Sequence, residues 1–265
     1  FVCGDVVNPN WFDPRYFDEI FHLASPASPL HYQARPHDTT KANVYGTFNC
    51  LRWLKPGGRI FFSSTSEVYG DPIVSPQPET YKGQVNCIGP RACYDEAKRC
   101  AEAILFDAWR TQDVDIKVVR FFNAYGPGTL PDDGRAVSNF VAQALGGKPI
   151  TVYGDGLQTR CFTFMDDVID GTMRFMYDTP GFYGPLNIGM DRETPVLEIA
   201  QFVQQLGAEI TGHKVPIEFH QPAVDDPKQR KPDLELARRQ IGWNPQIPYE
   251  KGIFLTLQHF KEEFF

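Results

Sequence analysis

Basic residues are in the minority in this sequence of 265 residues, with 26 Lys and Arg against 33 Asp and Glu. The formal net charge of −7 argues against broad nucleic-acid binding, which needs a basic surface. No apolar run approaches the about 18 residues that indicate a membrane-spanning helix. The first residues, Phe1 to Asp5, do not resemble a signal peptide. We therefore expect no nucleic-acid partner and no membrane segment in this chain.

Paired cysteines are also missing. The six cysteines include no CxxC pair and no zinc-ligand spacing, so we expect no metal site. Scattered cysteines in a chain of this length are typical of a reducing compartment. The sequence thus favours a cytoplasmic protein, with a membrane anchor upstream of Phe1 left open.

A glycine-rich turn is missing from the beginning of the sequence. A dinucleotide site normally opens with a strand, such a turn and a helix whose N-terminus holds the pyrophosphate. Phe1 to Val6 instead resembles the end of a later strand and its turn. We expect that an N-terminal βαβ segment of roughly 60 residues is absent, on the usual size of such units. The alternative is a fold that never had this segment.

The rest of the sequence alternates short apolar runs with amphipathic stretches, the pattern of a parallel sheet with crossover helices. Apolar runs of β-branched and aromatic residues predict strands, and apolar residues every three or four positions predict helices. The end of a strand and its turn are expected over 1–6, strands over 19–25, 59–66 and 116–126, the first and last of these three buried, and helices over 38–54, 94–110 and 138–145.

Beyond about Ile150 the pattern of the sequence changes, and the predicted strands and helices become shorter. A strand is expected over 215–220, and helices over 196–206 and 234–241. The predicted fold class is α/β: a doubly wound parallel sheet, Rossmann-like and N-terminally incomplete, with a smaller C-terminal α/β lobe. We divide the chain into 1–150 and 151–265, with some later segments returning to the first domain. In such sheets the ligand lies beyond the carboxyl ends of the strands.

Tyr94 and Lys98 form a YxxxK motif in the longest predicted helix. Residues four apart share one helix face, so the two side chains should be neighbours. A nearby ammonium stabilises a phenolate, which would lower the tyrosine pKa from about 10 toward neutrality and make a general base. The motif alone is weak, because it arises by chance in many helices as a surface tyrosine beside a solvated lysine.

A strand that ends in hydroxyl groups lies upstream of this helix, in the sequence SSTSEVYG from Ser63 to Gly70. The strand should bring serine or threonine oxygens to the sheet edge, where they can bind a substrate hydroxyl. A hydroxyl-bearing strand end, a loop and a YxxxK helix resemble the catalytic arrangement of the short-chain dehydrogenase/reductase family.

The resemblance extends over nearly the whole chain and is to the extended, NAD-dependent epimerase/dehydratase branch of that family. Within this branch the pattern looks most like that of the UDP-glucuronate decarboxylases (UDP-xylose synthases). The segments that carry it are FHLASPASP (21–29), TTKANVYGTFN (39–49), SSTSEVYGDP (63–72), IGPRACYDEAKRCAE (88–102), RFFNAYGP (120–127), DDGRAVSNFV (132–141), TVYGDGLQTRCF (151–162) and DDPKQRKPD (225–233).

The resemblance implies a reaction and a cofactor. UDP-glucuronate would be oxidised at C4 by tightly bound NAD, lose carbon dioxide as a β-keto acid and be reduced to UDP-xylose. Tyr94 would take the C4 hydroxyl proton, Thr65 would hydrogen-bond that oxygen, and Lys98 would hold the cofactor ribose. Residues 1–150 would then be a partial NAD-binding domain, and 151–265 mainly a substrate-binding lobe.

Three residues discriminate between activities of the family. Ser66 and Glu67 stand where many 4,6-dehydratases have an Asp-Glu pair and many 4-epimerases have small apolar residues. Arg230 in QRKPD resembles an arginine that faces the substrate, and a guanidinium fits a carboxylate or phosphate. The alternatives are a capping or surface carboxylate for Glu67, and for Arg230 a solvated charge in a basic run with Lys228 and Lys231.

Further contacts follow from the resemblance alone. It implies a UDP-sugar substrate and a homodimer formed by the helices over 38–54 and 94–110. Arg135 and Arg160 could each instead be surface cations. The implied cofactor contacts are Asp5, Val6, Leu23, Ser25 and Arg135, and the implied substrate contacts are Lys41, Asn49, Asn123, Val137, Tyr153 and Arg160.

The sequence also departs from the family pattern. Gly128 replaces a common arginine, Ala124 a frequent threonine and Leu130 a common histidine, which puts loop geometry and some cofactor contacts in doubt. Three other enzymes of the same scaffold stay open: a UDP-sugar 4-epimerase, a 4,6-dehydratase, and a decarboxylase that releases the 4-keto pentose. A non-catalytic nucleotide-binding fragment is the alternative from another class.

Overall fold

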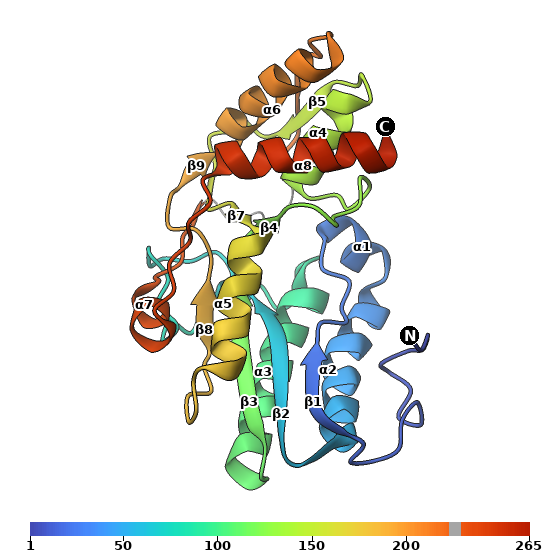
Figure 1. Cartoon of the computed structure of the whole chain (residues 1–265), viewed down its shortest axis with the longest axis vertical. Helices are drawn as coiled ribbons and strands as arrows, with labels where there is room; N and C mark the ends of the chain where they lie inside the picture. The colour runs from blue at the N-terminus through green and yellow to red at the C-terminus, as the bar shows by residue number, and fades with distance from the viewer. Residues whose placement is uncertain (223–228) are drawn as a thin grey trace.

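A four-stranded parallel sheet organises the computed structural model, which describes residues 1–222 and 229–265 (Figure 1). The carboxyl ends of the strands point toward a second lobe in the upper part of Figure 1. Side chains that follow these strands therefore meet at the junction of the two lobes. In spatial order the strands are β1 (Phe17–His22), β2 (Leu54–Thr65), β3 (Asp115–Phe121) and β8 (Leu186–Ile188).

Helices cover both faces of this sheet. On β2, Ile60 and Phe62 pack into one apolar cluster, while Phe61 between them packs with Phe175 and Trp243 in another. This is the period-two alternation of a strand that is buried on both faces. The helices are α2 (Pro36–Trp53) and α3 (Ala92–Thr111) on one face, α5 (Met165–Tyr177) on the other, and α1 (Pro29–Ala34) and α7 (Glu235–Ile241) at the periphery (Figure 1).

The second lobe has its own apolar core, with Val141, Val203 and Leu257 fully buried in it. Two short sheets and a 3-10 turn join the lobe to the main sheet. No helix of the described ranges is both long and apolar enough to cross a bilayer. The remaining elements are η1 (Ser66–Tyr69), β4 (Ala124–Tyr125), α4 (Ala136–Leu145), β5 (Ile150–Tyr153), β6 (Thr159–Arg160), β7 (Thr163–Phe164), β9 (Thr194–Pro195), α6 (Val196–Thr211), β10 (Ile217–His220), β11 (Gln229–Arg230) and α8 (Tyr249–Phe264).

The predicted fold class is confirmed, and the helices over 38–54 and 94–110 lie within a few residues of α2 and α3. Of the strand end and turn expected over 1–6, the turn is found at Val6 and Val7, but the strand end was wrong because no described strand pairs with residues 1–5. The strand expected to be buried over 19–25 is β1, which is largely exposed because it forms the sheet edge. The long strand over 116–126 is broken at Asn123, whose φ of 33° is incompatible with a continuous strand.

The division at residue 150 stays a prediction, and two observations bear on it. The apolar core of the second lobe already includes Tyr125 and Val137, so that core begins before Ile150. Strand β8 and helices α5 and α7 lie beyond residue 150 but pack with the main sheet. The chain therefore crosses between the lobes more than once.

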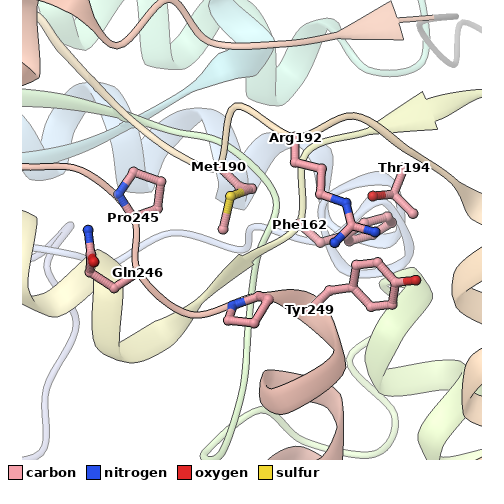
Figure 2. Close-up of a pocket in the computed structure, with 8 residues that line it drawn as sticks. Phe162, Met190, Arg192, Thr194, Pro245, Gln246 and Tyr249 are labelled. Atoms are coloured by element: carbon pink, nitrogen blue, oxygen red, sulfur yellow. The ribbon is translucent and has the colours of Figure 1, made fainter.

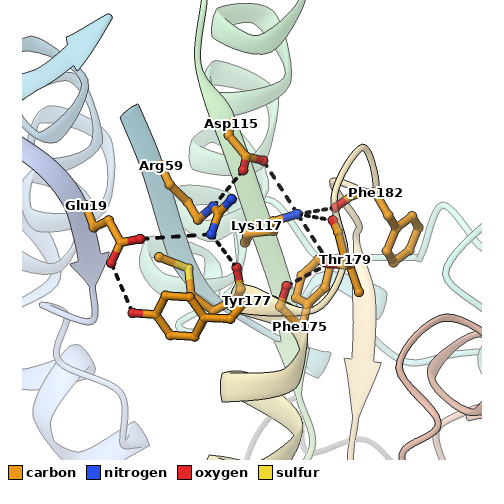
Figure 3. Close-up of polar contacts among 9 residues, drawn as sticks. Glu19, Arg59, Asp115, Lys117, Phe175, Tyr177, Thr179 and Phe182 are labelled. Atoms are coloured by element: carbon orange, nitrogen blue, oxygen red, sulfur yellow. Dashed lines mark hydrogen bonds and ion pairs between the residues drawn. The ribbon is translucent and has the colours of Figure 1, made fainter. Parts of the chain in front are cut away.

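A buried lysine closes the amino-terminal end of the main sheet, away from the second lobe (Figure 3). The Lys117 ammonium is fully buried and donates to the carbonyl oxygens of Thr179 at 2.6 Å and Phe182 at 2.7 Å. Beside it, Arg59 Nε donates to Asp115 Oδ2 at 2.6 Å. These contacts attach the loop after α5 to β2 and β3. They also offset the cost of burying the Lys117 ammonium, which would be high without hydrogen-bond acceptors.

Candidate active site

The carboxyl end of β2 brings hydroxyl groups to the junction of the lobes, as predicted. Thr65 ends the strand because its Oγ1 accepts a hydrogen bond from the Glu67 backbone N–H at 3.2 Å and so caps η1. The turn closes at Gly70, with φ of 62°, where an added Cβ would lie 1.9 Å from the Gln84 carbonyl oxygen. Only glycine fits there, so the turn holds Ser66 and Glu67 in fixed positions.

The YxxxK residues face this strand end from α3. Tyr94 is 6% exposed and shares a hydrogen bond with the Thr65 side chain. Lys98, one turn later, is 2% exposed, and its Nζ donates to the Ser63 carbonyl oxygen at 2.6 Å. The reading of a surface tyrosine beside a solvated lysine is therefore wrong. The structure brings Tyr94, Lys98 and Thr65 together.

The pKa of Tyr94 does not move in the predicted direction. Burial raises it, with Glu67 adding to the rise and the hydrogen bond from Thr65 opposing it. Burial also lowers the pKa of Lys98 to about 7, against the opposing charge of Glu102. The expectation that Lys98 lowers the tyrosine pKa is corrected here, because both groups are buried and the ammonium is engaged by a strand carbonyl.

Arg230 and Glu67 form the most heavily buried charge pair of this region. Arg230 is 2% exposed, and its Nη1 donates to Glu67 Oε1 and, at 3.3 Å, to Ser66 Oγ. Its Nη2 donates to the Gly70 carbonyl oxygen at 3.1 Å. Arg230 is thus no solvated cation, and Glu67, with a side chain 16% exposed, is no surface carboxylate. The residues 225–228 of the same motif, Lys228 included, lie outside the described residues.

Two charged residues of this site were missed by sequence reasoning. Arg91 donates from Nη2 to the other oxygen of Glu67, Oε2, and its Nε lies 4.0 Å from Asp95 Oδ2. Burial would raise the pKa of Glu67, but Arg230 and Arg91 lower it to about 2. Burial and then the Glu67 charge raise the pKa of Asp95 to about 7, against Arg91. The sequence did contain a signal for Arg91. It lies three residues before Tyr94, and this spacing places the two side chains on the same helix face.

A polar network beneath the site ties α3 to the sheet. Glu102, one turn after Lys98, accepts from Ser64 Oγ at 2.5 Å and from Arg120 at 2.9 and 2.6 Å. Arg120 Nη1 also donates to the Tyr69 hydroxyl at 3.0 Å. Because every charge in this group is paired, α3 is fixed in rotation and height relative to β2 and β3.

The residues assigned to the cofactor lie around the carboxyl end of β1. Leu23 is 58% exposed, and Asp5 is exposed with Oδ1 accepting from the Val7 N–H at 2.9 Å. Ser25 Oγ accepts from Asn43 Nδ2 at 2.9 Å, and the Val6 carbonyl accepts from Asn49 at 2.8 Å. Their donors, acceptors and exposed apolar surface fit a dinucleotide that lies along this sheet edge.

Two of the predicted substrate contacts, which stay predictions, are buried. Asn49 is 8% exposed and holds the Val6 carbonyl through its amide. It lies eight residues along α2 from exposed Lys41, which is about 12 Å at 1.5 Å per residue. Val137 is 3% exposed within the core of the second lobe. Helical periodicity alone did not reveal which faces of α2 and α4 are buried.

The other predicted contacts lie around the junction of the lobes. Asn123 has a buried Nδ2 without a hydrogen-bond partner among the described residues. Arg160 on β6 is the register partner of Arg230 on β11, so the two arginines are adjacent. Tyr153 ends β5 and is 51% exposed. Arg135 is 42% exposed and pairs with Asp133 at 2.6 Å.

A separate cavity of about 330 Å³ opens beside the beginning of α8 (Figure 2). The Arg192 guanidinium lies 4.8 Å from the centre of the Tyr249 ring and pairs with Glu250 at 3.0 Å. None of the predicted site residues lines this cavity, so we do not assign it to the reaction. Its walls are Phe162, Met190, Arg192, Thr194, Pro245, Gln246, Pro248 and Tyr249.

Sequence comparison finds curated relatives that are UDP-glucuronic acid decarboxylases. Number 4 from Arabidopsis thaliana is 47% identical over 265 residues, which is 100% of this chain and 58% of the relative. Number 6 from the same plant is 45% identical over 98% of this chain and 74% of the relative. The chain thus spans 58% of the length of the first of these relatives.

Comparison of structures leads to the same group of folds. A UDP-glucose 4-epimerase from Thermotoga maritima, solved with UDP-glucose, superposes with a TM-score of 0.81 at 28% identity, over 92% of this chain and 77% of its own. An NAD dependent NDP-hexosamine 5,6-dehydratase of tunicamycin biosynthesis superposes with a TM-score of 0.83 at 26% identity, over 98% and 82%. Residues 5–189 match the sequence pattern of one family, and the chain belongs to it: the NAD dependent epimerase/dehydratase family.

Proposed function

We propose that this protein decarboxylates UDP-glucuronate to UDP-xylose through a 4-keto intermediate, using tightly bound NAD. The observation that carries the proposal is the buried Glu67–Arg230 pair beside the Tyr94–Thr65 hydrogen bond. It joins a carboxylate, a guanidinium and a phenol at the carboxyl end of β2. The names of the curated relatives support the same reaction.

The chemistry requires oxidation before decarboxylation. Direct loss of carbon dioxide from a glucuronate would leave an unstabilised carbanion, whereas a 4-keto group β to the carboxylate accepts the electrons. NAD, when bound, supplies the acceptor and later the donor of the C4 hydride. Tyr94 takes and returns the C4 hydroxyl proton, and Thr65 Oγ1 holds the same oxygen.

The remaining charges sort into cofactor and substrate roles. Lys98, Ser25, Asp5 and the exposed surface of Leu23 would hold the dinucleotide, because together they offer donors, an acceptor for ribose hydroxyls and an apolar surface. Since Glu67 is bound by two arginines, its function is to orient Arg230 and the sugar ring rather than to supply a proton.

The substrate would span both lobes. Arg230 and Arg160 are register partners on adjacent strands, and their guanidinium groups would suit a carboxylate and a diphosphate. Exposed Tyr153 offers a ring for the uracil, and the unpartnered amide of Asn123 offers a donor to the sugar. The side chains of Lys41 and Arg135 are solvent-accessible cations that would contact phosphates.

The direct test is the product formed from UDP-glucuronate and NAD. Carbon dioxide and UDP-xylose should form without net NADH accumulation, as measured by trapped radiolabelled carbon dioxide, chromatography and absorbance at 340 nm. Stoichiometric NADH with a 4-keto pentose would instead identify an oxidative decarboxylase. An unchanged carbon count with inverted C4 would identify a 4-epimerase, and either result would refute the proposal.

We also propose a homodimer formed through α2 and α3. Three large apolar side chains project from these helices into solvent: Tyr45 at 55%, Phe48 at 54% and Trp109 at 38% exposure. Exposed aromatic residues gathered on two neighbouring helices are typical of a helix-packing interface. Light scattering at micromolar concentration should give twice the monomer mass, and a monomer would contradict the proposal.

A further inference from the structure

Glu67 is held by two arginines that come from different parts of the chain. Arg230, on β11, donates to Oε1, and Arg91, directly before α3, donates to Oε2. Each carboxylate oxygen thus has its own guanidinium partner. The position of Glu67 is fixed from two sides, because a change in either arginine would leave one oxygen without that partner.

Arg91 is also part of the segment that positions the phenol. It is 8% exposed and precedes Tyr94 by three residues, and its carbonyl accepts the Tyr94 N–H at 3.0 Å and the Asp95 N–H at 3.1 Å. The beginning of α3 is therefore joined to Glu67 by the Arg91 side chain and to Tyr94 by the Arg91 backbone.

We propose that Arg91 is a positioning residue that sets Glu67, and through it Arg230, at a fixed place relative to Tyr94. Arg230 enters the site from β11 in the second lobe, whereas Tyr94 belongs to α3 beneath the main sheet. The chain Arg230–Glu67–Arg91 is the charged connection between them. The proposal rests on the proposed function, since it assigns Arg91 a part in the same site.

Opposite charges at close range explain why such a chain can be buried. Glu67 lies between the positive charges of Arg230 and Arg91, and the carboxyl group of Asp95, whose pKa burial raises to about 7, is the second acid beside Arg91. The other titratable groups that act on this group of charges are the carboxylate of Glu96, which raises the pKa of Asp95, and the phenols of Tyr94 and Tyr32, which stack at 5.0 Å between ring centres. Removing Arg91 would leave Glu67 with one cation against a second buried carboxyl group.

The test compares Arg91→Met and Arg91→Lys with the unmodified protein. Arg91→Met should lower kcat by about 10–100-fold with little change in KM, because misplacement of about 1 Å in an active site costs up to about 10²-fold. Arg91→Lys keeps the charge and should recover part of kcat. Arg59→Met is the matched control, because Arg59 pairs with Asp115 at the other end of the sheet, and its kcat should be unchanged.

A second measurement does not depend on catalysis. Carbon-13 NMR of labelled glutamate, assigned with Glu67→Gln, should show Glu67 ionised throughout pH 4–7 in the unmodified protein. In Arg91→Met its midpoint should rise by about 1–3 pH units, the usual effect of one neighbouring charge, and in Arg91→Lys by less. Unchanged titration in Arg91→Met would overturn the proposal, and so would an equal loss of kcat in Arg59→Met.

The two proposals can fail separately. If the unmodified protein releases no carbon dioxide, the decarboxylase function fails, but the Glu67 titration still decides whether Arg91 holds this carboxylate. If carbon dioxide is released and Arg91→Met has normal kcat, the function stands and the positioning role is refuted. Should Arg91→Met not fold, as judged by circular dichroism, Arg91→Lys decides the matter: normal kcat with a raised Glu67 midpoint would refute the role.

Discussion

Replacing Asp95 by asparagine should change how the stability of this protein depends on pH. The Asp95 side chain is 9% exposed, and its Oδ1 has no hydrogen-bond partner among the described residues. Burial, followed by the charge of Glu67, raises the pKa of Asp95 to about 7, although Arg91 opposes the rise. The carboxyl group is therefore one that the folded protein prefers to keep protonated.

The sign and size of the effect follow from linkage. An aspartate in an unfolded chain has a pKa of about 3.9, so the folded protein binds this proton more tightly. The resulting stabilisation is present at low pH and is lost as pH rises toward 7. With a folded pKa of about 7, the loss between pH 5 and pH 8 amounts to about 3 kcal/mol, as an order of magnitude.

The assay is urea unfolding at pH 5, 6, 7 and 8 for the unmodified protein and for Asp95→Asn. Relative to the variant, the unmodified protein should lose about 3 kcal/mol of unfolding free energy over this range. Glu67, with a pKa of about 2, stays ionised throughout and cancels in the difference. Asp107→Asn removes an exposed charge farther along α3, at 71% exposure, and should leave the pH dependence unchanged. Parallel curves for Asp95→Asn and the unmodified protein would refute the reasoning.

Four further changes test other parts of the structure. Tyr94→Phe should lower the decarboxylation rate by about 10²–10⁴-fold or more and abolish transient absorbance at 340 nm in stopped flow. Glu102→Gln leaves Arg120 buried without its anion and should cost about 3–5 kcal/mol in urea unfolding. Trp243→Ala removes a 1% exposed side chain from the core and should cost about 3–5 kcal/mol in the same assay. Phe48→Asp should weaken the proposed dimer, as measured by sedimentation velocity.

The sequence predicts well those helices and strands whose buried side is shown by their own pattern of apolar residues. The helices over 38–54 and 94–110 were found because one apolar face repeats along them, and β2 because its apolar run is continuous. The strand end expected within 1–6 and the burial of β1 were predicted wrongly. Both features depend on which strand lies next to the segment in the sheet, and the sequence of the segment alone does not show this.

The site divides in the same way. Tyr94, Lys98 and Thr65 follow from local spacing and strand ends, and the structure brings them together. The burial of Asn49 and Val137 was not predicted, because a helical repeat does not say which face meets the core. Arg91 and Asp95 escaped notice because their importance comes from a carboxylate 24 residues away from Arg91, on the turn after β2.

The register of α3 restricts how this protein can evolve. Arg91, Tyr94, Lys98 and Glu102 follow one another at intervals of three or four residues and face Glu67, Thr65, Ser63 and Ser64 respectively. One inserted residue would rotate everything beyond it by about 100°, which removes the later members of the series from their partners together. Between Arg91 and Glu102, the number of residues is as constrained as their identity.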